Sequence, residues 1–381
     1  MRILFSFVGG RGHFDPMAPV ARALLARGHQ VLVAGGGSHV PSLAKAGFTV
    51  FATSAPRVAD HARQPMLPVD PVRDDWEISE LFVRRATRER VPVLLDLAED
   101  WRPDLIVHDE VDFAAAIVAE KVRLPCVNVL VLAAGTLLRD EIVAEPLAEA
   151  RVEQGLPGRP AVPGQVLVPF PPSFRDPGSP LPPGAFSFRQ GALVPLRARN
   201  AKPHVYFTLG TNFNLESGDL IERTLAGLGR LGDVEVTATV GTQIDPAEFG
   251  PQPGHVRVER FVPQAELLPH LDLMASHAGS GSVIGALSHG LPSLLFPMGA
   301  DQPGNARRCV ALGVGRALDP ETVTPDEIRE AAEEVLGDPG YHEKAQRLQR
   351  EINGLPAAEE TVPLLEALVR TSARGSFPPA P

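Results

Sequence analysis

Short apolar runs alternate with amphipathic, helix-like stretches from residue 2 to about residue 155. The runs that predict strands are RILFSFV at 2–8, QVLVAG at 30–35, FTVFA at 48–52, DLIVHD at 104–109 and PCVNVLV at 125–131. Such runs are typical of strands buried on both faces, and the stretches between them are typical of βαβ crossover helices. The pattern therefore predicts an α/β domain built on a parallel sheet.

The alternation stops in the proline- and glycine-rich residues 156–200 and then resumes. The later strand candidates are HVYFTLG at 204–210, VEVTATV at 234–240, VRVERFV at 256–262, LDLMASH at 271–277 and PSLLFP at 292–297. We expect a first domain over residues 1–195, in which 156–200 forms a connecting segment. A second domain of similar architecture is expected over 201–355, with a crevice between the two.

The first glycine cluster, in the stretch VGGRGHFDP, follows the first predicted strand. Residues 16–27 carry apolar side chains at helical spacing, with Pro16 suited to the first helical position and Asp15 to the N-cap. A carboxylate there would compete with a phosphate, and the glycine spacing does not fit Gly-x-Gly-x-x-Gly. We therefore expect this loop to hold His13 at the carboxyl edge of the sheet.

The second glycine cluster, SHAGSGSVIGALSHG at 276–290, has a different pattern. A strand ends at His277, an apolar helical stripe begins at Val283, and no acidic residue of this stretch occupies the helix start. Small residues, free amides and the helix dipole favour a phosphate at such a position. We expect His277 to supply an additional donor there.

Charge and composition exclude several classes of partner. The chain has 381 residues and a formal net charge of −10, with no basic run, which disfavours nucleic acid and anionic membranes as partners. Cys126 and Cys309 lack CxxC partners and are interpreted as buried free thiols. No signal peptide or membrane-spanning run is recognised, so a cytoplasmic location is expected. Without an Asp-x-Asp triplet, no metal site and no cofactor are expected.

The motifs closely resemble those of glycosyltransferases that modify small lipophilic molecules, the family 1 enzymes of antibiotic and plant natural-product tailoring. The matching stretches are GHFDP at 12–16, VHD at 107–109, VYFTLGT at 205–211, RFVPQ at 260–264, HAGSGS at 277–282 and PMGADQPGNA at 297–306. The resemblance implies a GT-B fold, with two Rossmann-like domains, the acceptor in the first and a nucleotide sugar in the second. It also implies that residues 356–381 hold a helix, at 357–371, that crosses back onto the first domain.

The same resemblance implies roles for individual residues. His13 would be the general base and Asp109 would orient it, in an inverting transfer without metal. The donor would be held by Gly210, Thr211, Phe261, Val262, Gln264, His277, Gly279, Ser280, Gly281, Ser282, Asp301 and Gln302. From the residues alone, simpler roles stay open: His13, Asp109, Thr211 and Asp301 could be caps, and Phe261 could be core.

One departure from the family concerns the donor nucleotide. Eight residues after His277, where many relatives carry a glutamate that binds the ribose hydroxyls, this chain has Gly285. A site without that carboxylate would lose little with a donor whose ribose lacks the 2′-hydroxyl. We therefore expect a thymidine diphosphate (dTDP) sugar rather than a uridine diphosphate (UDP) sugar.

The acceptor is expected to be a lipophilic small molecule whose identity the sequence does not specify. Residues assigned to its site are Gly12, Phe14, Met66, Trp76, Phe82 and Leu137. A homodimer or an auxiliary protein partner is left open. Two other functions also stay open: a nucleotide-sugar epimerase or hydrolase of the same fold, and a non-catalytic auxiliary subunit.

Overall fold

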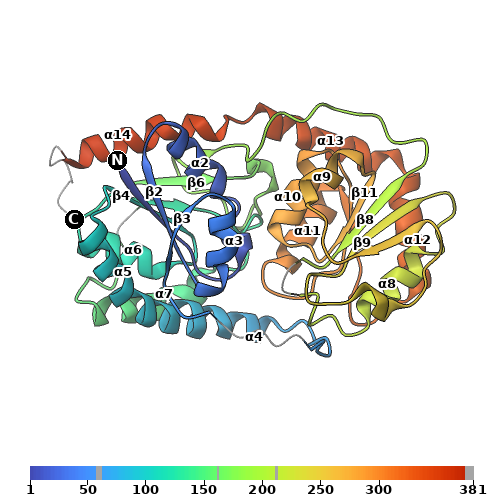
Figure 1. Cartoon of the computed structure of the whole chain (residues 1–381), viewed down its shortest axis with the longest axis horizontal. Helices are drawn as coiled ribbons and strands as arrows, with labels where there is room; N and C mark the ends of the chain where they lie inside the picture. Colours follow the sequence, from blue (N-terminus) through green and yellow to red (C-terminus); the bar gives the residue numbers. More distant parts are fainter. Residues whose placement is uncertain (57–61, 161–162, 211–212, 374–381) are drawn as a thin grey trace.

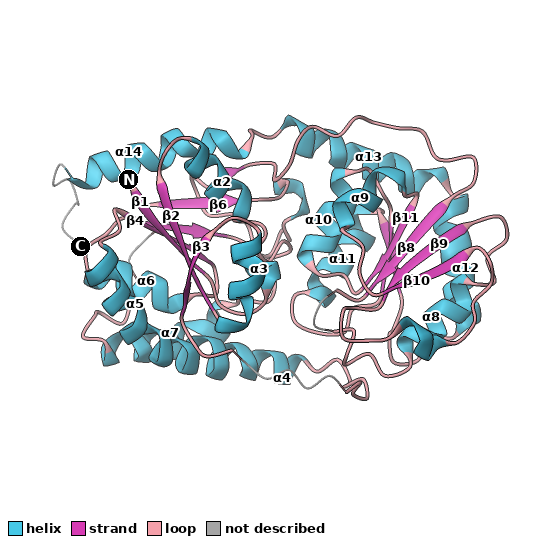
Figure 2. Cartoon of the chain, viewed as in Figure 1, coloured by secondary structure: helices cyan, strands magenta, loops and turns pink. Residues whose placement is uncertain are grey.

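The computed structural model describes residues 1–56, 62–160, 163–210 and 213–373. Two parallel sheets lie side by side, one in each half of the chain (Figures 1 and 2). The first is a seven-stranded sheet with the order β3-β2-β1-β4-β5-β6-β7. Its strands are β1 (Arg2–Ser6), β2 (Gln30–Gly35), β3 (Thr49–Ala52), β4 (Leu105–Asp109), β5 (Cys126–Val129), β6 (Gln165–Val168) and β7 (Phe186–Ser187).

The second half repeats this arrangement with a six-stranded sheet in the order β10-β9-β8-β11-β12-β13. Its strands are β8 (His204–Thr208), β9 (Glu235–Thr239), β10 (Val256–Glu259), β11 (Leu273–Ser276), β12 (Ser293–Leu295) and β13 (Gly315–Ala317). In both sheets the chain winds outward from one strand and then returns to its other side. The neighbouring pairs β1/β4 and β8/β11 are therefore the topological switch points, where ligands of open α/β sheets bind.

Helices cover both faces of each sheet (Figure 2). In the first half they are α1 (Arg11–Phe14), α2 (Ala18–Ala26), α3 (Val40–Lys45), α4 (Pro71–Trp76), the π-helix η2 (Glu77–Ala86), α5 (Thr87–Trp101), α6 (Phe113–Lys121) and α7 (Asp140–Glu153). In the second half they are α8 (Leu220–Leu228), α9 (Gln264–Leu267), α10 (Ser280–Ser288), α11 (Gln302–Leu312), α12 (Pro325–Gly337) and α13 (Pro339–Gly354). This is the GT-B arrangement of two Rossmann-like domains.

The segment 156–200 is more than a connection, which corrects the expectation from its composition. Within it, β6 pairs with β5 and β7 pairs with β6, so both extend the first sheet. Each strand is short and lies at or next to the sheet edge, where flanking prolines are tolerated. Phe170 and Phe174 of the same segment are buried in a hydrophobic cluster that also contains Ile284 and Leu348 of the second half. The two halves thus share a continuous apolar contact.

The last helix, α14 (Thr361–Ala373), crosses back onto the first half, as expected (Figure 1). Val362 and Leu365 are fully buried in the core of the first half, beside residues of α2. His29 at the start of β2 lies 3.1 Å from the Glu366 carboxylate. Burial of the two apolar side chains, at about 2 kcal/mol each, holds the helix in place.

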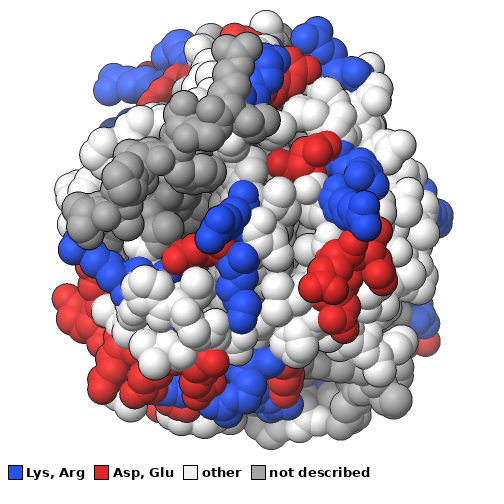
Figure 3. Space-filling view, turned by 90° about the vertical axis from the view of Figure 1, so that its left-hand side faces the viewer, with Lys and Arg blue, Asp and Glu red and all other residues white. Residues whose placement is uncertain are grey.

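The surface of the first half carries charges of both signs. On the face seen in Figure 3, described lysines and arginines lie close to aspartates and glutamates, and neither sign forms a continuous field there. Such a distribution does not favour a polyanionic partner on the part of this face that the structure describes. Among all described residues, no helix is long and apolar enough to cross a membrane.

Candidate active site

The switch point of the first sheet brings His13 and Asp109 together. His13 lies in the single-turn helix α1, shortly after β1, and Asp109 is the last residue of the neighbouring β4. His13 Nδ1 is 3.3 Å from Oδ2 of Asp109, which is completely buried. Asp109 is held in turn by the backbone amides of Val8 and Val111, which donate to its two carboxylate oxygens. The Asp109 carboxylate is thus fixed facing the imidazole, and Asp112 rather than Asp109 caps α6.

Gly9 of the first loop leaves the space that the His13 imidazole occupies. Gly9 has a φ of +88°, and a Cβ on it would lie 3.0 Å from His13 Nε2. An alanine would therefore be strained and would push against the ring. Burial lowers the pKa of His13, but the contact with Asp109 and its charge outweigh this, so the pKa is raised above its ordinary value.

The helix after this loop begins later than expected. The N-cap of α2 is Met17 and Pro19 lies in its first turn, whereas Asp15 follows α1 and pairs with Arg11 at 2.6 Å. Pro16 precedes the helix as part of a turn. The expected N-cap role of Asp15 is therefore wrong: the chain makes the extra turn α1 first, and this turn carries His13.

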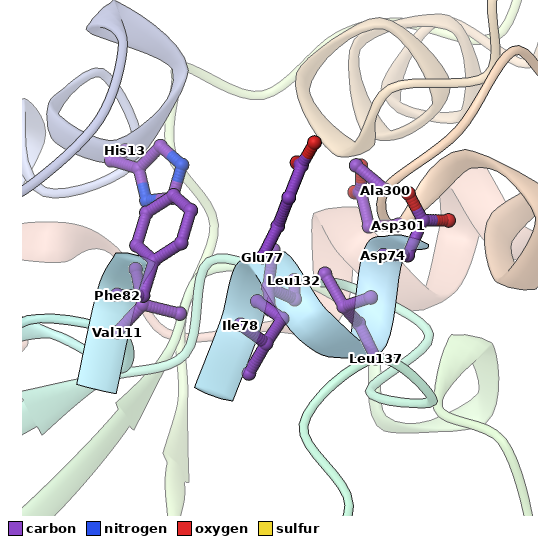
Figure 4. A pocket seen from close by; sticks show the side chains of 10 residues that line it. All are labelled: His13, Asp74, Glu77, Ile78, Phe82, Val111, Leu132, Leu137, Ala300 and Asp301. Atoms are coloured by element: carbon purple, nitrogen blue, oxygen red, sulfur yellow. The ribbon is translucent and has the colours of Figure 1, made fainter. Parts of the chain in front are cut away.

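A cavity opens beside His13, and side chains of both halves line it (Figure 4). Phe82 of η2 stacks against the imidazole with ring centroids 6.5 Å apart. Asp301, from the second half, lies at the other end of the same cavity. The lining residues are His13, Asp74, Glu77, Ile78, Phe82, Val111, Leu132, Leu137, Ala300 and Asp301.

Of the residues assigned to the acceptor, the structure brings Phe82 and Leu137 into this cavity. Phe14 is fully buried in the core between Phe7 and Phe48, so it offers no surface to an acceptor. Met66 packs against the core of the second half, and Trp76 is 55% exposed. Gly12 is exposed, and neither it nor Met66 nor Trp76 lines the cavity.

The second switch point surrounds His277 with glycines. A Cβ on Gly210 would lie 2.7 Å from Cε1 of this ring, and a Cβ on Gly279 would lie 2.6 Å from its Nε2. Gly210 also has a φ of +77°, a conformation open to glycine. Burial lowers the pKa of His277 to about 4, although the charge of Asp301 acts in the opposite direction. The ring is therefore neutral at neutral pH and can donate one hydrogen bond.

The start of α10 differs from the expectation that no acid occupies it. Asp301 Oδ2 accepts from the Ser280 hydroxyl at 2.6 Å and lies 3.3 Å from the Ser280 amide. Asp301 is also the N-cap residue of α11, but its side chain makes no capping bond to a backbone amide there; it bonds the Asn305 side chain of α11 and reaches the neighbouring α10. The amides of Gly281 and Ser282 lie in the same first turn, where no intrahelical carbonyl is available to them.

The other residues assigned to the donor site differ in how deeply they are buried. Phe261 is 62% exposed, so a core role is excluded for its ring. Val262 is partly buried against the cluster of Leu267 and Met274. Gln302 is buried and accepts from the Met298 amide. Thr211 lies outside the described residues.

Gln264 and Gly285 are neighbours in space. A Cβ on Gly285 would lie 3.5 Å from Gln264 Oε1, so the position where relatives carry glutamate faces a side chain assigned to the donor. Both residues belong to the second half, on α9 and α10. The departure from the family pattern therefore lies beside a residue that the sequence assigns to the donor site.

Three carboxylates near the cavity were missed by sequence reasoning. Asp74 and Glu77 line it, and burial raises the pKa of both. Glu110 is buried next to Asp109, and its pKa is raised to about 7, again mainly by burial. The spacing of three residues between Asp74 and Glu77 was the available signal for the first pair, because it places both on one helix face. For Glu110 the signal was a second acid directly after Asp109.

The remaining expectations concern metals and thiols. No group of three or more His, Cys, Asp or Glu side chains within the described ranges is arranged to hold a metal ion. Cys309 is a buried free thiol, and burial raises its pKa to about 12. Cys126 is also free but only partly buried, because β5 leaves one side partly open.

Comparison with known families gives two matches that together span most of the chain. The N-terminal domain of the family described as erythromycin biosynthesis protein CIII-like matches residues 22–150, and its C-terminal domain matches residues 222–368. The L-demethylnoviosyl transferase of Streptomyces niveus is 31% identical, over 92% of this chain and 94% of that protein. The 10-deoxymethynolide desosaminyltransferase of Streptomyces venezuelae is 29% identical and covers 100% and 99% of the two chains.

Solved structures show the same fold. The spinosyn rhamnosyltransferase SpnG complexed with thymidine diphosphate superimposes with a TM-score of 0.81 at 26% identity, covering 96% of this chain and 100% of that one. The glycosyltransferase VinC in complex with dTDP gives a TM-score of 0.72 at 26% identity, covering 98% and 100%. Both similarities extend over the two halves of the chain.

Proposed function

This chain belongs to the erythromycin biosynthesis protein CIII-like family and is a glycosyltransferase of the antibiotic-tailoring type; from this premise we propose its donor and its mechanism. It transfers the sugar of a dTDP-sugar donor to a lipophilic natural product, with inversion at the anomeric carbon and without a metal ion. The observation that carries the proposal is the shared cavity, which has His13 of one half and Asp301 of the other among its lining residues. A proton acceptor and a side chain suited to sugar hydroxyls thus face the same space.

His13 acts as the general base. Its Nδ1 faces the Asp109 carboxylate, which leaves the lone pair of Nε2 to take the proton of the acceptor hydroxyl. The acceptor oxygen then bonds to the anomeric carbon as the bond from that carbon to the diphosphate oxygen breaks. The electron pair of that bond leaves with the nucleoside diphosphate, and the buried Asp109 stabilises the imidazolium that forms.

The leaving diphosphate is stabilised from the second half. The first-turn amides of α10 at Gly281 and Ser282 and the neutral His277 supply donors without adding a mobile counter-charge. Preorganised donors of this kind stabilise developing negative charge. The expected partners also include Gly279, whose lack of a side chain leaves the His277 ring uncovered.

A thymidine nucleotide is favoured by the region around Gly285. Without a side chain there, no carboxylate reaches toward a ribose 2′-hydroxyl from α10, and Gln264 lies against the gap. SpnG and VinC, both similar to this chain throughout, have been solved with thymidine diphosphate. Titration of dTDP and UDP by calorimetry tests the preference, and tighter binding of UDP would contradict it.

The transfer itself is tested by nucleotide release. Purified protein is incubated with a panel of dTDP-sugars, with and without a mixture of lipophilic aglycones, and dTDP is measured. We expect acceptor-dependent release that His13→Ala lowers by roughly 10²- to 10⁴-fold, while His270→Ala, on the exposed end of η5 (Leu268–His270), leaves it unchanged. Release of dTDP that depends neither on the acceptor nor on His13 would indicate a hydrolase instead. Nucleotide binding without any release would indicate an auxiliary subunit.

A further inference from the structure

Four successive backbone amides, at residues 131–134, connect the two halves next to the cavity. The amides of Val131 and Leu132 both donate to Glu110 Oε1, at 2.5 Å each. The amide of Ala133 donates to Ser280 Oγ at 2.8 Å, and that of Ala134 to the side chain of Asn305 at 3.1 Å. One short segment is therefore attached at one end to the acid beside Asp109 and at the other to Ser280, the first residue of α10, and to Asn305 of α11.

The hydroxyl of Ser280 is fully used by these contacts. It accepts from the Ala133 amide and from Asn305 Nδ2, and it donates its proton to Asp301 Oδ2. A serine hydroxyl has one proton and two lone pairs. Ser280 can therefore donate to a diphosphate only if it releases Asp301, which differs from the role that its place in the motif implies.

The Asp301 carboxylate is held through one of its oxygens. Oδ2 accepts from the Ser280 hydroxyl and from Asn305 Nδ2, at 2.6 and 2.8 Å. Within the described part of the chain, no hydrogen bond to Oδ1 is found, and Asp301 lines the cavity with His13. One oxygen is thus anchored, and the other is available to a hydroxyl of a bound sugar.

The segment that supports this anchor is itself tightly held. Arg175 Nη1 donates to the Leu132 carbonyl at 2.8 Å. Gly135 has a φ of +77°, and a Cβ on it would lie 1.9 Å from Arg175 Cζ, so the guanidinium packs directly on the backbone. Movement of residues 131–134 would break bonds in both halves at once.

We propose that Glu110 and Ser280 are positioning residues: Ser280 holds Asp301 directly, and Glu110 supports that contact through residues 131–134, so that Asp301 presents the donor sugar to His13. The inference rests on the proposed function, in which Asp301 binds that sugar. Neither residue touches the reacting atoms. Glu110 acts from the acceptor side and Ser280 from the donor side, so a change in either should disturb sugar placement while the nucleotide remains bound.

The test compares nucleotide with nucleotide sugar. Calorimetry with dTDP and with dTDP-glucose is performed on wild type, Ser280→Ala, Ser280→Thr, Glu110→Ala and Glu110→Gln. We expect both alanine variants to bind dTDP as wild type does and to bind dTDP-glucose about tenfold more weakly. Thr keeps the hydroxyl, and Gln keeps the single oxygen that accepts both amides, so these two variants should restore the wild-type ratio of the two affinities.

Kinetics and folding controls complete the test. Both alanine variants should lower kcat/KM for transfer by about ten- to a hundredfold. The double variant should lose little more than either single variant, because both residues belong to one chain of contacts that ends at Asp301. Thermal unfolding identifies a variant that fails to fold; should Glu110→Ala do so, the Ser280 pair and Glu110→Gln still decide.

Two results would overturn the inference. An equal loss of affinity for dTDP and dTDP-glucose in Ser280→Ala would show that the hydroxyl binds the diphosphate. Unchanged binding and transfer in both alanine variants would show that neither residue positions anything. A failure of the proposed function is distinct from these, because wild type itself would then bind neither ligand or would release no nucleotide on addition of an acceptor.

Discussion

The two switch points of the molecule each hold a histidine, and the two histidines differ in charge behaviour. His13 lies 3.3 Å from the buried carboxylate of Asp109, and its pKa is raised. His277 is enclosed by glycine backbone, and burial lowers its pKa to about 4. Asp301, whose charge acts on His277, is bonded to Ser280 and Asn305 instead. The pKa of the same type of side chain is thus raised at one site and lowered at the other.

The difference shows that a directed carboxylate decides the outcome when burial is similar. Burial disfavours the charged imidazolium at both sites. Only at the first site does a carboxylate approach the ring closely enough to reverse this. A base must accept a proton during the reaction, whereas a group that binds a leaving diphosphate needs only to donate a hydrogen bond.

The most direct way to remove the difference is Asp109→Asn. An amide facing Nδ1 would donate to it and place the imidazole proton on Nε2, which is the wrong tautomer for a base. We expect kcat to fall by roughly 10²- to 10⁴-fold. The acid limb of the pH profile of the residual activity should move to lower pH than in wild type. The charge that raises the His13 pKa is then gone, while the burial that lowers it remains. A pH profile of kcat/KM measures this, and an unmoved limb would contradict the pairing.

Gly9→Ala disturbs the first histidine without changing any charged group. The new Cβ would lie 3.0 Å from His13 Nε2 at a φ of +88°. We expect kcat/KM to fall by about a hundredfold, because a misplaced base loses its alignment, while dTDP affinity is retained. Gly28→Ala is the matched control: its φ is +80°, but nothing lies within 4 Å of the added carbon. Equal losses in both variants would point to strain rather than displacement of the ring.

Gly279→Ala makes the corresponding change beside the second histidine. Its Cβ would lie 2.6 Å from His277 Nε2, so the ring must move. We expect the affinity for dTDP to fall by about tenfold, the value of one hydrogen bond to a charged group. Gly254→Ala, in the exposed turn before β10, serves as the control, since its added carbon meets nothing within 4 Å. Calorimetry decides, and an unchanged Gly279→Ala would exclude His277 from the diphosphate site.

The smallest expected effect is a difference in pH dependence: binding of the dTDP-sugar should hardly change with pH, whereas transfer should change. His277 has a pKa of about 4 and stays neutral from about pH 5.5 to about pH 8. Binding of a dTDP-sugar should change by less than about twofold over that range. Transfer should decline as pH falls, because a raised pKa increases the protonated fraction of His13 at each pH relative to an ordinary histidine. Parallel declines in binding and transfer would mean that one group controls both.

Much of the fold was predictable because it depends on local patterns. Every apolar run predicted as a strand contains one, since burial on both faces leaves a recognisable run of residues such as 30–35 and 104–109. The strands β6 and β7 were missed because the prolines around them carry a stronger local signal for turns. Asp15 was misassigned for a similar reason: its neighbour Pro16 fits a helix start, but the chain turns once more before α2.

Within the candidate site, the predictions succeeded where the topology is regular. His13 follows β1 and Asp109 ends the neighbouring β4 of the same parallel sheet, so their approach follows from the strand order. Phe14 and Phe82 have the same residue type and could not be separated by composition, yet one is core and the other lines the cavity. Met66 lies against the second half because its segment leaves the first sheet altogether.

The sequence by itself determined the two α/β halves, the glycine loops at their switch points and the histidines within them, because these follow from short-range periodicity and from the rule that parallel strands end at one edge. Only the tertiary structure decided which acid reaches which group. Asp301 lies twenty-one residues after Ser280 yet bonds its hydroxyl, and Ala133 of the other half bonds the same oxygen. Such contacts depend on how separate elements dock, and hydrogen bonds across a docked interface leave no periodic trace in the chain.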